Sequence, residues 1–155
     1  MRIKFLLLSL SFTHLIVAQN KNDVSKGLKE FNNDTAKYIE QRIISKRNCY
    51  EGQPLDSLLK DLPKIINYAN GDSPRNVSIY DATVLYFASH RAVMDKLEQK
   101  KFPMVLTITW ATPLNNNDLP ALGLKIGGGE WTETAYKYYK NKIIGKIEII
   151  QYKAQ

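Results

Sequence analysis

The amino-acid sequence predicts an α+β fold, with a mostly antiparallel sheet of about four to five strands and helices packed on one face. Two observations lead to this class. Amphipathic helical patterns come first, between residues 34 and 62, and runs rich in β-branched and aromatic residues dominate from residue 64 onward. These runs do not alternate regularly with helices, whereas a parallel α/β sheet requires that alternation.

Two helices are predicted at the front of the domain. Asn33 or Asp34 can cap the first, which runs to about residue 46. Pro54 suits the first turn of the second helix, where its missing N–H is not needed, and Pro63 ends it. The inner side of the second helix carries leucines at helical spacing, at Leu55, Leu58, Leu59 and Leu62. Leu58 and Leu59 are therefore expected in the core, and Asp56 and Asp61 on the wet side.

The remaining elements follow from changes in the hydrophobic period. Strands are predicted over 64–69, 77–89 with a break near Asp81, 103–111, 121–127 and 145–153. Residues 70–76 are rich in turn formers, 112–120 read as a loop, and 130–142 as a helix. Residues 89–101 fit either a short helix or part of a long hairpin, and a helix there would permit one parallel strand pair.

The first 18 residues have the layout of a secretory signal peptide. A basic start with Arg2 and Lys4 precedes an apolar run over 5–18 that ends at the small Ala18. The run is shorter than the roughly 18 to 20 apolar residues that span a bilayer. Cleavage is expected between Ala18 and Gln19, leaving no further transmembrane segment. Residues 19–32 are then expected to form a flexible N-terminal arm, and 33–155 a single α+β domain.

Composition narrows the chemistry of the exported chain. Removing Arg2 and Lys4 lowers the formal charge from +7 to +5, which in an exported protein favours acidic surfaces over nucleic acid as partners. Cys49 is the only cysteine, so no internal disulfide can form. One histidine and one cysteine are too few for a zinc site. No metal or cofactor is predicted.

Two groups of residues near the second helix invite a catalytic interpretation. Cys49 and His90 supply the minimum for a thiol hydrolase, although no hydrolase signature surrounds Cys49. Asp56 and Asp61 are five residues apart, which turns them about 140° from one another on a helix. They are therefore not expected to converge on one substrate atom, and no catalytic residue is assigned.

Two glycine- and tyrosine-rich runs remain. Gly127, Gly128 and Gly129 precede a helix start, and a turn is expected there because the Gly-Lys-Ser/Thr ending of a phosphate loop is missing. The run 136–142 interleaves tyrosine with lysine, a pattern that can stack on and attract a ligand. Tyr138 and Tyr139 are expected to face the core. The binding surface predicted from the sequence is therefore Tyr136, Lys137 and Lys140.

Three stretches resemble a group of small exported proteins of Bacteroidetes bacteria. They are YEGQPLDSLLKDL (50–62), MVLTITW (104–110) and YYKNKIIGKIEI (138–149). The resemblance implies export and a single domain, and it supplies no catalytic residues.

Together these observations predict an exported, non-catalytic binding or interaction protein of the bacterial envelope, periplasmic or extracellular. Its partner would be a protein or another envelope component. Two alternatives stay open: a small hydrolase that uses Cys49 with His90, and an inhibitor or immunity-like protein.

Overall fold

The computed structural model describes residues 24–73, 76–99 and 103–150. Its helices are an unlabelled one over 24–30, α2 (Thr35–Tyr38), α3 (Leu55–Leu59), α4 (His90–Glu98), α5 (Asp118–Ala121) and α6 (Glu133–Tyr139), with a π-helical turn η1 (Ile39–Ile43) and a 3₁₀ segment η2 (Ile44–Cys49). Its strands are β1 (Asn67–Ser73), β2 (Asn76–Tyr86), β3 (Val105–Asn115), β4 (Gly128–Glu130) and β5 (Ile144–Ile150). The predicted signal peptide, 1–18, lies outside the described residues.

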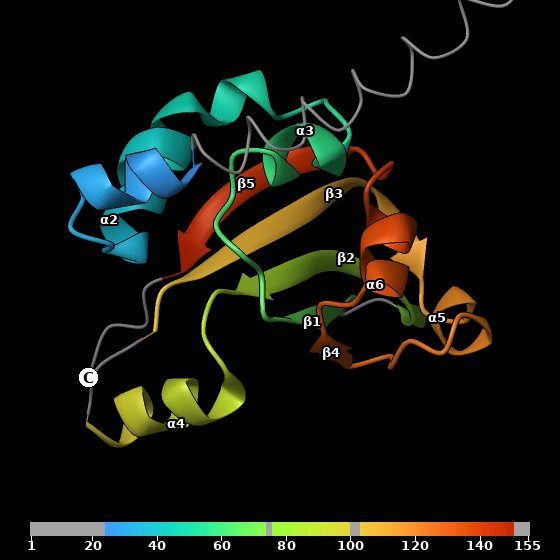
Figure 1. The fold of residues 1–155 in the computed structure, drawn as a ribbon. Coiled ribbons are helices and arrows are strands. Elements are labelled where there is room, and N and C mark those ends of the chain that lie inside the picture. Colours follow the sequence, from blue (N-terminus) through green and yellow to red (C-terminus); the bar gives the residue numbers. More distant parts are fainter. Residues whose placement is uncertain (1–23, 74–75, 100–102, 151–155) are drawn as a thin grey trace, which may run out of the picture.

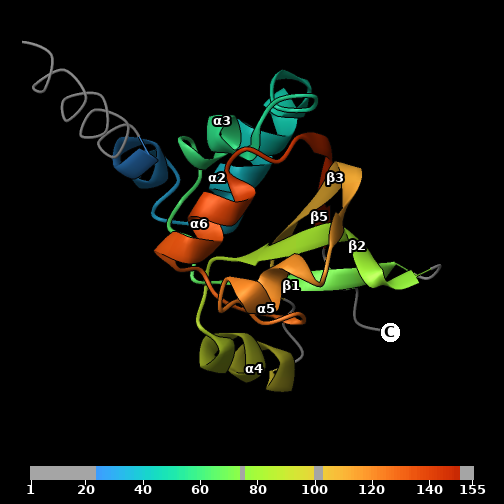
Figure 2. The ribbon, with the colours of Figure 1, turned by 90° about the vertical axis from the view of Figure 1, so that its right-hand side faces the viewer.

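The described strands form one antiparallel sheet in the order β4-β1-β2-β3-β5. Helices α2, α3 and α6 cover one face of it, while α4 lies apart from them at a corner of the sheet (Figures 1 and 2). The α+β class with a mostly antiparallel sheet is therefore confirmed. Within the described residues, no helix has the length and apolar character that crossing a bilayer requires.

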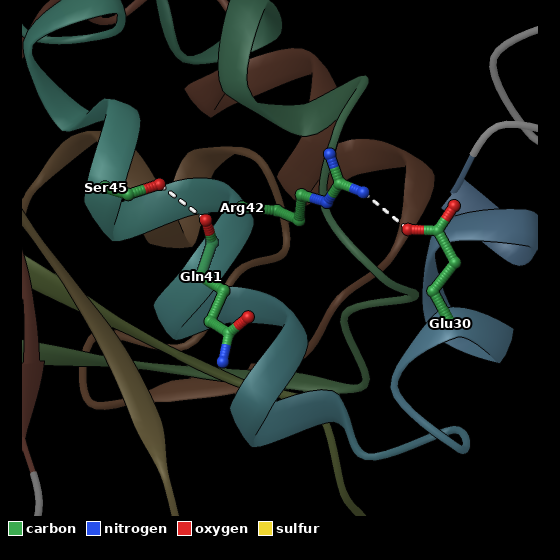
Figure 3. Close-up of polar contacts among 4 residues, drawn as sticks. All are labelled: Glu30, Gln41, Arg42 and Ser45. Atoms are coloured by element: carbon green, nitrogen blue, oxygen red, sulfur yellow. Dashed lines mark hydrogen bonds and ion pairs between the residues drawn. The ribbon is translucent and has the colours of Figure 1, made fainter.

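The first helical run confirms one of the two proposed caps. Asp34 Oδ1 accepts hydrogen bonds from the backbone N–H groups of Ala36 and Lys37 at 3.0 and 3.1 Å, which satisfies donors that a helix start leaves free. The run then leaves α-helical geometry through η1 and η2. In this region the Ser45 hydroxyl donates to the carbonyl of Gln41 (Figure 3), a side-chain bond that competes with the regular backbone ladder.

The expected flexible arm over 19–32 is wrong for its second half. Residues 24–30 are helical, and Val24, Leu28 and Phe31 pack against the core. Glu30 forms an ion pair with Arg42 of η1 (Figure 3). Three apolar residues at helical spacing stand among the many Asn and Lys residues of this segment, and the polar composition obscured the helix that they indicate. Residues 24–32 therefore belong to the domain, and residues 19–23 lie outside the described part.

Helix α3 starts after Pro54 as predicted and is fastened to the C-terminal end of α6. The N–H groups of Leu55 and Asp56 donate to the carbonyls of Lys142 and Lys140 at 2.9 and 2.8 Å. Leu58 is fully buried, as predicted. Leu59 is only half-buried at the margin of the core, so its predicted place in the interior is confirmed only in part.

Helix α4 settles the ambiguity over 89–101. Ser89 caps it by accepting a hydrogen bond from the N–H of Ala92 at 3.3 Å. The strands that it joins, β2 and β3, are antiparallel neighbours, so the parallel pair that a helix here would permit does not form. The predicted irregularity near Asp81 is present, because the β2–β3 register shifts between Tyr80 and Ala82.

The predicted strand over 121–127 is wrong. Leu119 and Leu124 are buried on either side of a turn, which the N–H of Leu124 closes on the carbonyl of Leu119 at 2.9 Å. Leu122 and Ile126 remain 47 % and 46 % exposed. The alternation of apolar residues is therefore not that of a strand. It arises because the turn buries Leu124 and leaves Leu122 and Ile126 exposed. Other boundaries also move: β1 continues through 70–73, and 112–120 contains the end of β3 and α5.

The expected glycine turn is confirmed only at Gly127, where the N–H of Gly128 donates to the carbonyl of Lys125 at 3.2 Å, and the next two glycines form an edge strand instead. Gly128 and Gly129 pair with Ala69 and Tyr68 of β1. Gly128 has φ +112°, and a Cβ atom there would lie 2.3 Å from the carbonyl oxygen of Tyr68. Only glycine fits so close an approach of β4 to β1.

A chain of hydrogen bonds crosses the core beneath α6. The Tyr80 hydroxyl donates to the Tyr139 hydroxyl at 3.2 Å, and that hydroxyl donates to Asn70 Oδ1 at 3.0 Å. Thr83 also donates to Asn70 Oδ1 at 3.0 Å, and the Trp110 indole N–H donates to the Thr83 hydroxyl at 3.0 Å. This satisfies polar groups that would be costly to bury without partners.

Candidate functional site

The three predicted binding residues lie together on the outer side of α6. The Tyr136 hydroxyl donates to Asp56 Oδ1 of α3 at 2.9 Å. Lys140 Nζ lies 5.5 Å from the centre of the Tyr136 ring. Lys137 pairs with Glu133 one turn earlier, at 3.7 Å.

The charges of this α6 face are largely offset within the protein. Asp56 also forms an ion pair with Lys60 at 3.3 Å, so its carboxylate contacts both a lysine and a tyrosine. The hydrogen bond to Asp56 raises the pKa of Tyr136, and partial burial adds to the effect. Asp56 therefore anchors α6 to α3. A ligand at this face would have to compete with these contacts.

Asp61 is anchored as well. Its carboxylate accepts a hydrogen bond from the Tyr50 hydroxyl at 2.8 Å, and its carbonyl accepts one from the Tyr38 hydroxyl at 2.9 Å. Burial raises the pKa of Tyr50, and the bond to Asp61 raises it further. The sequence predicted only a surface charge at Asp61. Its two tyrosine partners are 11 and 23 residues away, so no local sequence pattern indicates these contacts.

Cys49 and His90 are not brought together. Cys49 is exposed at the end of η2, which packs against β5. His90 starts α4 and lines a hollow with Asn67 of β1. Three strand spacings of about 4.8 Å separate β1 from β5, and both views place η2 and α4 at opposite edges of the sheet (Figures 1 and 2). A base must lie within hydrogen-bond reach of its thiol, so this arrangement does not form a dyad.

A hollow of about 490 Å³ lies between the start of α2 and α4. The ends of β2 and β3 form its floor. Apolar and polar side chains line it in similar measure, and Phe87, Val93 and Met104 are among the apolar ones. Asp34 and Lys96 add one charge of each sign.

Two further hollows, of about 420 and 380 Å³, continue from the first around the beginning of α4. The first and second share Tyr86 and Val93, and the second and third share Asn67 and His90. The helix therefore stands off the sheet, with concave surface on more than one side. Sequence reasoning missed this region, because its lining comes from five separate segments and their meeting depends on the tertiary fold.

The geometry shows no metal centre: within the described residues, three or more metal-ligating side chains do not gather anywhere. Comparison with known proteins adds no identity, since the chain matches no family model, no curated protein and no solved structure.

Proposed function

We propose that this chain is an exported, non-catalytic binding protein of the bacterial envelope, and that it binds its ligand in the hollow between α2 and α4. The observation that carries the proposal is the volume of about 490 Å³. Ligand sites in proteins are concave and typically measure about 300 to 1,000 Å³. The α6 face, by contrast, is a helix surface on which Tyr136 and Lys137 already have polar partners.

The lining of the hollow indicates the chemistry of the ligand. Phe87, Val93 and Met104 provide apolar contact, and Lys96 provides a cation on one wall. Asp34 stands on the other wall, where one of its carboxylate oxygens already caps α2. An amphiphilic ligand fits this division, with its apolar part on the floor and its polar part toward Lys96.

Filling the hollow tests the proposal directly. Ala88 lines it, so Ala88→Trp introduces bulk without removing a core side chain. The immobilised wild-type chain should capture a ligand from an envelope extract of the native organism, and Ala88→Trp should reduce that capture by at least about tenfold.

The matched control changes the other candidate surface. Tyr136→Ala, Lys137→Ala and Lys140→Ala together should leave capture unchanged while the chain stays folded. The reverse result, with capture lost only in the α6 variant, would transfer the binding site to that face. Capture that survives both changes would disprove both surfaces.

The non-catalytic part rests on the separation of Cys49 from His90. Cys49→Ser combined with His90→Gln should leave folding and ligand capture intact, as measured by circular dichroism and the same capture assay. A folded double variant that lost the cellular phenotype of the wild type would favour the hydrolase instead.

The export part rests on the basic start, the apolar run and Ala18 in residues 1–18. N-terminal sequencing of chain isolated from the envelope fraction should begin at Gln19. A sequence that began at Met1 would contradict cleavage.

A further inference from the structure

Helix α4 has apolar side chains that are exposed within the described part of the chain. None of its nine residues is buried. Met94 and Leu97 are 42 % and 39 % exposed, and at a spacing of three residues they are neighbours on the helix surface. They form what we call the α4 strip. The other large exposed apolar side chains of the described residues do not pair in this way within one helix.

The α4 strip lies beside the hollow, and its side chains do not line it. Val93 and Lys96 line the hollow, so their side of α4 faces the body of the protein. At about 100° per residue, the middle of the strip is turned roughly 100° from that side. Both views show α4 at a corner of the molecule, apart from the other helices (Figures 1 and 2). The strip is thus a surface separate from the proposed ligand site.

The charges beside the strip complement those of a second copy. Arg91 and Glu98 are seven residues apart, which places them within about 20° of each other on one flank of the strip. Neither is in an ion pair within the described part of the chain. In an antiparallel pair related by a two-fold axis, the same flank of each helix meets its counterpart. With the axis between residues 94 and 95, Arg91 of each copy faces Glu98 of the other.

We infer that two copies of this chain associate through antiparallel α4 helices. In this arrangement the two Met94 side chains pack against each other across the axis, Leu97 of each copy packs beside them, and two Arg91–Glu98 pairs close the rim. The apolar contacts provide the attraction, and the charged pairs fix the direction and register. The inference goes beyond the proposed function, since it uses none of the residues that line the hollow.

The expected dimer is weak. A helix of nine residues is about 14 Å long, and two such helices bury less than the roughly 1,200 Å² of a standard interface. Association should therefore depend on concentration, over about 10 μM to 1 mM. Sedimentation equilibrium of the purified chain across this range should show a reversible monomer–dimer equilibrium.

Charge exchange tests the geometry. Arg91→Glu and Glu98→Arg should each weaken self-association by at least about tenfold, because every rim pair then carries like charges. An equimolar mixture of the two variants should associate as tightly as the wild type, since both rim pairs are again opposite in sign. The double variant with both changes should also recover. Recovery on mixing distinguishes contact between copies from an effect within one copy.

Two controls complete the experiment. Lys137→Glu in α6 changes an exposed charge away from α4 and should leave association unchanged, whereas Met94→Gln with Leu97→Gln should abolish it. Circular dichroism should show all variants folded, because the changed side chains are exposed. A wild-type chain that stays monomeric up to about 1 mM, or single variants that do not recover on mixing, overturns the inference.

Discussion

Helices α4 and α6 occupy opposite extremes of packing, although both carry amphipathic sequences. The shorter α6 buries Ala135 and Tyr139 completely, while the longer α4 buries no residue. The Tyr139 ring stacks between Trp110 and Trp131, with ring centres 5.6 and 5.7 Å away. Length and amphipathicity therefore do not decide whether a helix joins the core.

The topology of the sheet explains the difference. Helix α6 lies between β4 and β5, which form opposite edges of the sheet, so the chain has to cross the face to reach the second edge. Helix α4 connects β2 and β3, which are antiparallel neighbours. That connection needs no crossing, and α4 can remain at the corner. The crossing helix becomes part of the core, and the connecting helix stays available for contacts with ligand or partner.

The largest expected effect comes from removing the central ring of the α6 side. Tyr139→Ala should lower the free energy of unfolding by about 3 to 5 kcal/mol, as for other buried aromatic residues. Leu97→Ala in α4 should change it by about 0.5 kcal/mol or less. Urea denaturation of both variants measures the contrast. Equal losses would show that α4 is packed as firmly as α6.

Two neighbouring leucines of α3 compare a fully buried position with one at the margin of the core. Leu58→Ala should cost about 2 to 5 kcal/mol, since Leu58 is fully buried. Leu59→Ala should cost clearly less, because its side chain is only partly buried at the margin of the core. The same denaturation series compares the two variants, and a larger loss at Leu59 would reverse their assigned positions.

The tyrosines of the packed side should make the protein sensitive to alkali. Burial raises the pKa of Tyr139 from 10.0 to about 12, and it raises that of Tyr80 further. Below pH 10 the hydroxyls stay protonated in both states, so stability does not change. Between about pH 10 and 12 only the unfolded chain ionises them, and each tyrosine should lower stability by about 1.4 kcal/mol per pH unit.

Tyr139→Phe provides the control for this dependence. The variant should lose some stability at neutral pH, because the Tyr80 hydroxyl loses an acceptor and Asn70 Oδ1 loses a donor. Above pH 10 its stability should fall less steeply than that of the wild type, by the share of one tyrosine. Parallel slopes would mean that Tyr139 ionises as readily in the folded protein as in the unfolded one.

The smallest effect is expected at Asp61. Asp61→Asn keeps an oxygen that can accept the hydrogen bond from Tyr50, so the free energy of unfolding should change by about 0.5 kcal/mol or less. Asp61→Ala removes the acceptor and should cost about 1 kcal/mol. Thermal unfolding of the pair isolates the bond. An asparagine variant as damaged as the alanine variant would show that the negative charge itself is needed.

Local sequence patterns determined the elements whose signals lie within a few residues. The cap at Asp34, the start of α3 after Pro54, and the strand residues of β2, β3 and β5 all follow from backbone preference and hydrophobic period. The α+β class followed from the same signals. Patterns of this kind fail where burial is decided by distant segments, as in the leucine alternation over 121–127 and the apolar residues hidden in 24–31.

Only the tertiary structure decided the surfaces that we propose for binding. The sequence placed Tyr136, Lys137 and Lys140 on the outside of α6, but their partner Asp56 is 80 residues from Tyr136. It also could not separate Cys49 from His90, nor bring the start of α2 beside α4 to form a hollow. Local propensity acts over one or two turns of chain, whereas these juxtapositions depend on sheet order. The order of the strands carried α6 across the core and left α4 at the corner.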